Sequence, residues 1–157
     1  MKSEAPYIIN SISESHRLLG LEKPKHPLIS VINYDDVKTF SGQNLKTKSY
    51  NFYTISIKKG FKGKVKYGQQ YYDFDEGVLI GLAPKQVILS EISVNTILSG
   101  WSIMIHPDFI QPYPLAKKMA AYGFFSYAVH EALHLSDEEE KEIEAIMKTF
   151  TASVIKR

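Results

Sequence analysis

Tyr50-Asn51-Phe52-Tyr53-Thr54-Ile55-Ser56-Ile57-Lys58 is the stretch that decides the fold. Tyr53, Ile55 and Ile57 fall on one face of an extended chain, and the residues between them fall on the other. This period of two is typical of a β-strand with one buried face. The stretch therefore predicts a strand in a sheet that covers a core.

Short runs of similar character surround this stretch, each bounded by Gly, Pro or Asp. They are 28–32, 64–67, 71–74, 78–80, 86–89 and 100–106. Gly60-Phe61-Lys62-Gly63 predicts a hairpin turn between 50–58 and 64–67, because glycines permit tight turns. Short strands at this spacing indicate a sandwich or a barrel, so the predicted fold is mainly β.

Helices are predicted on both sides of the strands. Ser11 and Glu14 form a capping box, and Gly20 is placed to end the first helix. After Pro107, a helix is predicted over 115–122 with Gly123 as its C-terminal cap. The whole chain is therefore expected to be α+β.

The last helix is predicted to begin at Ser136, because Ser136 and Glu139 form a second capping box. Its apolar residues recur at helical spacing and form one stripe. They are Ile143, Ile146, Met147, Phe150 and Val154. Either a partner subunit or the chain's own strands would cover this stripe, and a homodimer is the expected arrangement.

His130-Glu131-Ala132-Leu133-His134 spells the H-E-x-x-H signature of zinc peptidases. That chemistry requires both histidines on one face of a helix. Here a helix begins only at Ser136, and the residues 124–129 before the motif are aromatic and β-branched, as in a strand. We therefore expect no metal, no cofactor and no catalytic residue in this segment.

Composition limits the classes of protein to which the chain could belong. The 157 residues suit a single domain, 44% of them are hydrophobic, and a net charge of +2 is too small to indicate nucleic-acid binding. The chain has no cysteine, so disulfides and thiolate metal sites are excluded. No signal peptide and no stretch of about 18–20 apolar residues is visible, so we expect a cytoplasmic protein without membrane contact.

A small-molecule cavity inside the barrel is the candidate site. Aromatic and apolar residues on predicted strands could point inward and line it. They are Tyr53, Ile55, Tyr67, Tyr72 and Trp101. A filled core without a ligand explains the same residues equally well.

Two other features have plain explanations. A group of lysines around one hairpin fits anion binding, but a solvated hairpin with a protected edge explains it better. These are Lys58, Lys59, Lys62, Lys64 and Lys66. His106 is the only histidine between Tyr50 and Pro107, which does not support a metal-binding cupin. We expect His106 to organise a turn by hydrogen bonding.

Several segments resemble the sensor domain of AraC-type transcriptional regulators of the Bacteroidetes type. The resemblance covers nearly the whole chain in the same order. The matching segments are 23–30, 59–77, Gly100-Trp101, 106–109, 113–118 and 122–127.

This resemblance implies a cupin-like double-stranded β-helix, or jelly-roll barrel, over about 1–110 and a helical dimerisation segment over about 111–157. It also implies a non-catalytic role in sensing a small-molecule effector. DNA would be bound only through a helix-turn-helix domain, which these residues lack. If the resemblance holds, the chain would be either an isolated sensor half or a naturally truncated regulator. The alternatives are a small metal-dependent cupin or H-E-x-x-H enzyme, and a carbohydrate-binding β-sandwich.

Overall fold

The computed structural model describes residues 5–37, 47–59, 61–67, 70–74, 77–89, 99–121 and 133–155. Its strands are β1 (Tyr7–Ile9), β2 (Ile29–Asn33), β3 (Thr47–Tyr50), β4 (Tyr53–Lys59), β5 (Phe61–Tyr67), β6 (Gln70–Phe74), β7 (Val78–Leu82), β8 (Ile88–Leu89), β9 (Ser99–Ile105) and β10 (Leu133–His134). Its helices are α1 (Ile12–Leu18), α2 (Pro107–Ile110), α3 (Leu115–Ala121) and α5 (Asp137–Ile155), with a 3₁₀ turn η1 at Tyr34–Asp36.

A five-stranded antiparallel sheet with the order β10-β7-β4-β9-β2 forms the centre of the molecule. Strands β1, β3 and β8 form a second sheet, and β5 pairs with β6 in a third. The prediction of a β-rich α+β chain is confirmed. The described strands remain in three separate sheets and form no closed barrel.

The predicted hairpin between β4 and β5 is wrong. Strand β4 pairs with β7 on one edge and with β9 on the other, so no edge is left for β5. The predicted strand over 50–58 is also divided, since β3 ends at Tyr50 and β4 begins at Tyr53. Within 111–157, predicted to be helical, β10 adds an edge strand beside β7.

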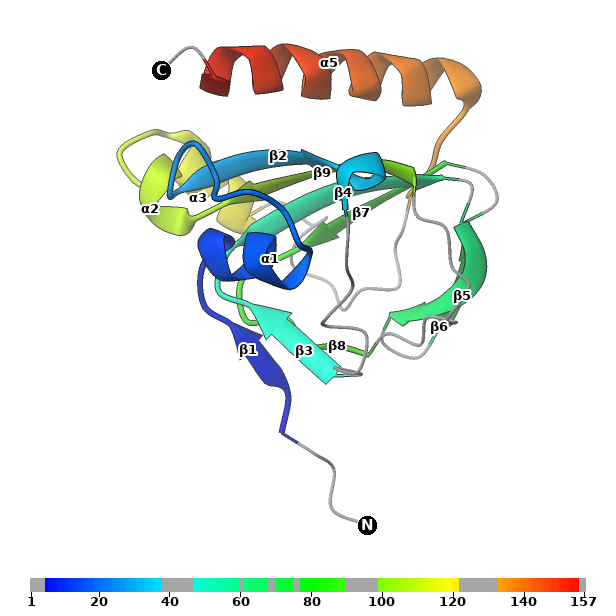
Figure 1. The fold of residues 1–157 in the computed structure, drawn as a ribbon, viewed down its shortest axis with the longest axis horizontal. Coiled ribbons are helices and arrows are strands. Elements are labelled where there is room, and N and C mark those ends of the chain that lie inside the picture. Colours follow the sequence, from blue (N-terminus) through cyan, green and yellow to red (C-terminus); the bar gives the residue numbers. More distant parts are fainter. Residues whose placement is uncertain are drawn as a thin grey trace.

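Helix α5 covers one face of the central sheet, and α1 lies on the other side (Figure 1). The face under α5 is apolar and forms a core with residues of α2, α3 and α5. Its buried members are Ile29, Ile103, Ile105, Ile110, Met119 and Met147. On the α1 side, a second core is built from Ile9, Ile12, Ile32, Phe52 and Met104.

The predicted ends of the helices are confirmed where the structure describes them. The Ser11 hydroxyl accepts a bond from the Glu14 amide, and Gly20 has a φ of 67°. Bonds from the Gly20 amide to the Arg17 carbonyl and from the Leu21 amide to the His16 carbonyl complete a Schellman motif. Gly123, the predicted cap of the helix at 115–122, lies outside the described residues.

At the start of α5, Ser136 and Glu139 form the predicted capping box. The Ser136 amide donates to the Glu139 carboxylate at 2.9 Å, and the Glu139 amide donates to the Ser136 hydroxyl at 3.3 Å. No helix in the described part of the chain is both long and apolar enough to cross a membrane.

Candidate functional site

A groove of about 580 Å³ runs along the outer edge of β2. This volume lies within the range of small-molecule sites, about 300–1,000 Å³. One wall is the segment that follows α1, and the other is β2 with the η1 turn. The lining includes residues 20–25, 29–33 and 35–37, together with His16 from α1 and Thr151 from α5.

His16 and Ser30 are buried polar residues of this groove, with 7% and 6% of their surfaces exposed. Its Nδ1 lies 2.8 Å from the Glu22 carbonyl oxygen, and its Nε2 lies 2.7 Å from the Ser30 hydroxyl oxygen. A carbonyl can only accept, so Nδ1 carries the proton, and Nε2 of the neutral ring accepts from Ser30. Burial lowers the pKa of His16 below 6.5, and the bond to the Glu22 carbonyl opposes this shift.

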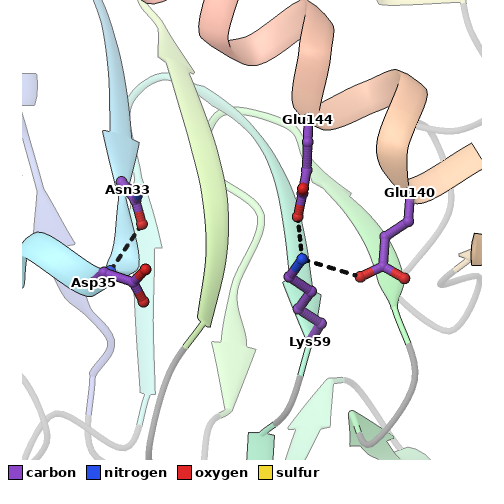
Figure 2. A network of polar contacts seen from close by, with 5 residues as sticks. All are labelled: Asn33, Asp35, Lys59, Glu140 and Glu144. Carbon is purple, nitrogen blue, oxygen red and sulfur yellow. Dashed lines mark hydrogen bonds and ion pairs between the residues drawn. The ribbon is translucent and has the colours of Figure 1, made fainter.

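The two ends of the groove differ in net charge, because Glu22, Lys23 and Lys25 together give +1 at one end and two aspartates give −2 at the other. Lys23 and Lys25 lie in the segment that leads to the first residue of β2. Asp35 and Asp36 lie in η1, directly after its last residue. The Asn33 side chain accepts a hydrogen bond from the Asp35 amide at 2.9 Å, which fixes the acidic end (Figure 2).

Thr151 connects the groove to the last helix. It lines the groove from the C-terminal half of α5. Its hydroxyl donates to the Met147 carbonyl at 2.9 Å, and Met147 is 5% exposed in the core under the helix. A molecule in the groove would therefore contact β2 and α5 together.

Ion pairs between side chains fix the first half of α5 to the sheet. Lys59 of β4 lies between Glu140 and Glu144 of α5, 3.6 Å from the Glu140 carboxylate (Figure 2). The hydrogen bond to Glu144, and then the charges of both glutamates, raise the pKa of Lys59 above 10.5. The Leu135 amide also donates to the Gly77 carbonyl at 2.9 Å. Strand β10 and the start of α5 are thus attached to β7 and β4.

The inner face of the sheet, on the α1 side, carries buried hydroxyls. Ser56 and Ser102 share a register position on β4 and β9, and their hydroxyl oxygens lie 2.8 Å apart. The Tyr34 hydroxyl lies 3.5 Å from Ser56 and donates to it. With Ser30 on β2, these hydroxyls make the inner face partly polar, although sequence analysis had assigned that face no special role.

Three of the five predicted cavity residues lie in the core under α5. The strand register puts Tyr53, Ile55 and Trp101 on the face under α5, where they pack against the apolar core. They do not line the groove beside β2. Tyr67 and Tyr72 lie on the β5–β6 pair, and their side chains lie outside the described residues.

The predicted stripe of α5 is divided between two environments. Ile143 and Met147 pack on the sheet. Ile146 and Phe150 are 63% and 37% exposed, and the side chain of Val154 lies outside the described residues. The chain's own sheet covers one part of the stripe and leaves the other part to solvent.

The histidines of the H-E-x-x-H motif do not share a described helix. His134 lies in β10, opposite Val78 of β7, and His130 lies outside the described residues. In the part of the chain that the structure describes, no group of three His, Cys, Asp or Glu residues could hold a metal ion. The prediction for His106 is confirmed, because its Nδ1 accepts from the Asp108 amide at 3.1 Å and caps α2.

Of the predicted lysine group, Lys59 has a role that sequence analysis missed, as the partner of two glutamates on α5. Lys58 lies over the Tyr34 ring, with its nitrogen 5.9 Å from the ring centre. The side chains of Lys62, Lys64 and Lys66 lie outside the described residues.

His16 was also missed. The signal was its spacing, four residues after Ile12 and three before Leu19, which places it on the inward side of α1.

In comparisons with known proteins, no family model, no curated protein and no solved structure matches the chain.

Proposed function

We propose that the chain is the effector-sensing and dimerisation domain of an AraC-type transcription regulator, with a cupin-like fold. The observation that carries the proposal is the groove shared by β2 and α5. A sensor domain requires a ligand site that contacts the element transmitting the response, and here Thr151 of the terminal helix lines the site beside His16 and Ser30.

The switch would operate through the second half of α5. The first half is fixed by Lys59 and by the capping box, whereas Thr151 faces the groove. A ligand that contacts Thr151 binds two placements of α5 with different affinity and so shifts their populations. In this proposal DNA is contacted by a helix-turn-helix domain and not by the residues described.

Dimerisation would use the exposed side of α5. Ile146 and Phe150 present apolar surface that the sheet does not cover. An isologous contact between two such helices would bury both residues of each copy. The ligand groove and the dimer contact would then lie on the same helix, which links effector binding to subunit arrangement.

Native mass spectrometry of the chain, purified without chelator, tests the proposal. We expect a dimer without metal, with or without a retained small molecule. A monomer that carries one zinc ion per chain would contradict the proposal and would favour the H-E-x-x-H enzyme instead.

A further inference from the structure

The outer edge of β2 carries backbone groups that bond to no other residue in the described part of the chain, and they lie on the groove side. In an antiparallel pair, alternate residues bond to the partner strand and the others point away from it. The His106 amide donates to the Leu28 carbonyl at 2.8 Å, so Ser30 and Ile32, of the same parity, face β9. The amides and carbonyls of Ile29 and Val31 therefore point away from β9.

No other described strand pairs with this edge. The central sheet ends at β2, and β9 is its only described neighbour. The groove lies along the same five residues, which offer an edge of about 16 Å at about 3.3 Å per residue. An extended chain of similar length can therefore bond to β2 as an added strand.

The charges at the ends of the groove define a direction. An added strand antiparallel to β2 begins near Asp35 and Asp36 and ends near Lys23 and Lys25. Its amino-terminal ammonium group would lie beside the aspartates, and its terminal carboxylate beside the lysines. The parallel orientation would place each terminal charge beside residues of the same sign.

We propose that the groove binds a short peptide with free termini, which adds to β2 as an antiparallel strand. This inference rests on the proposed sensor function and names the chemical class of the effector. Alternate peptide side chains would face the inner wall, with His16 and Ile32, or the outer wall, with Val31 and Thr151. The outer wall favours apolar side chains and places the peptide against α5.

Backbone NMR with a synthetic pool of pentapeptides, randomised at every position, tests this assignment. We expect the pool to shift and protect the amides of Ile29 and Val31 more than those of Ser30 and Ile32, which already face β9. The same pool with acetylated and amidated ends is the matched probe. Loss of both terminal charges should weaken binding on the order of tenfold.

A pair of double variants locates the charge contact. Lys23→Gln with Lys25→Gln removes the partners of one terminus, so it should weaken the free pool about threefold and leave the capped pool unchanged. Lys117→Gln with Lys118→Gln, which removes the same charge from exposed positions of α3, should change neither. Equal binding of free and capped pools, or shifts that do not alternate along β2, would overturn the inference.

The outcomes for the two proposals are separable. If no peptide binds but another small molecule binds and alters the dimer, the peptide inference fails and the sensor function stands. If the peptides bind as described but α5 and the dimer do not respond, the peptide site stands and the sensor function fails.

Discussion

His16 Nε2 lies 2.7 Å from the hydroxyl oxygen of Ser30, across the junction of α1 and β2. The pair is buried, and the Glu22 carbonyl holds the other ring nitrogen. The contact fixes the wall of the groove to the edge strand. Burial disfavours the charged ring and lowers the pKa of His16, and in the neutral ring Nε2 accepts from Ser30.

Stability should therefore depend on pH through His16. Its folded pKa is below 6.5, so the unfolded chain takes up a proton first as pH falls. The contribution is full above pH 6.5 and is lost as pH falls through the lower folded pKa. Urea denaturation at several pH values between about 8 and 5 measures this contribution. The free energy of unfolding should rise with pH over that range.

His16→Gln should flatten that slope and cost about 1–3 kcal/mol above pH 7, because a buried partner is left unsatisfied. Arg17→Gln, an exposed neighbour in α1, is the control and should retain the slope. If the two variants show the same pH dependence, His16 is not its source.

Among the glycines that the structure describes, Gly100 should be the least tolerant of substitution. Its φ is 120°, and an added Cβ would lie 2.0 Å from the Ile57 carbonyl oxygen in the middle of the sheet. Gly100→Ala should cost more than about 3 kcal/mol, measured by chemical denaturation. At Gly77 the nearest atom is the flexible Glu140 carboxyl group, 2.7 Å away, so Gly77→Ala should cost only about 1 kcal/mol.

Lys59→Met should loosen the first half of α5. Two glutamates one turn apart lose their shared cation, but the lysine is 37% exposed, so the cost should be only about 0.5–1 kcal/mol and should shrink in salt. The contribution of Lys59 is full below pH 10.5 and is lost as pH rises through its raised pKa.

Hydrogen exchange along α5 measures the local effect of Lys59→Met. Amides near Glu140 and Glu144 should exchange faster in the variant. Lys141→Met, at an exposed position of the same helix, should leave exchange unchanged. Unchanged protection in Lys59→Met would show that the capping box alone holds the helix.

Local sequence patterns were sufficient to predict the helix ends and many of the strands. They were insufficient to predict which strands pair and which face α5 covers. Ser11, Gly20 and Ser136 act on neighbouring residues, so their patterns predicted the helix ends. The β4–β9 pairing joins residues such as Ser56 and Ser102, which are 46 positions apart and carry no local signal for each other. The alternation in 53–57 separated the two faces correctly but could not show which face α5 covers.

The candidate site was less predictable than the fold. It depends on Thr151 reaching the edge of β2, and on a segment after α1 returning beside that strand. Aromatic residues were the sequence signal for a cavity, yet Tyr53 and Trp101 serve the core under α5. The groove is instead marked by backbone groups, a histidine and paired charges, which composition does not distinguish from an ordinary surface.

The dimer proposal predicts that Ile146→Glu combined with Phe150→Glu gives a folded monomer. Both residues are exposed, so the double variant should change unfolding free energy by less than about 0.5 kcal/mol per site. Met147→Ala, in the core, should instead cost about 2–5 kcal/mol. Sedimentation equilibrium gives the mass, and Lys148→Gln, with the same charge change per site, should remain dimeric.

The measurement that tests the central claim most directly is hydrogen exchange along β2 and α5, with and without the free pentapeptide pool. The account predicts slower exchange at Ile29 and Val31 and, in the same sample, altered exchange around Thr151. Protection of β2 with no change in α5 would contradict the claim that the groove communicates with the terminal helix.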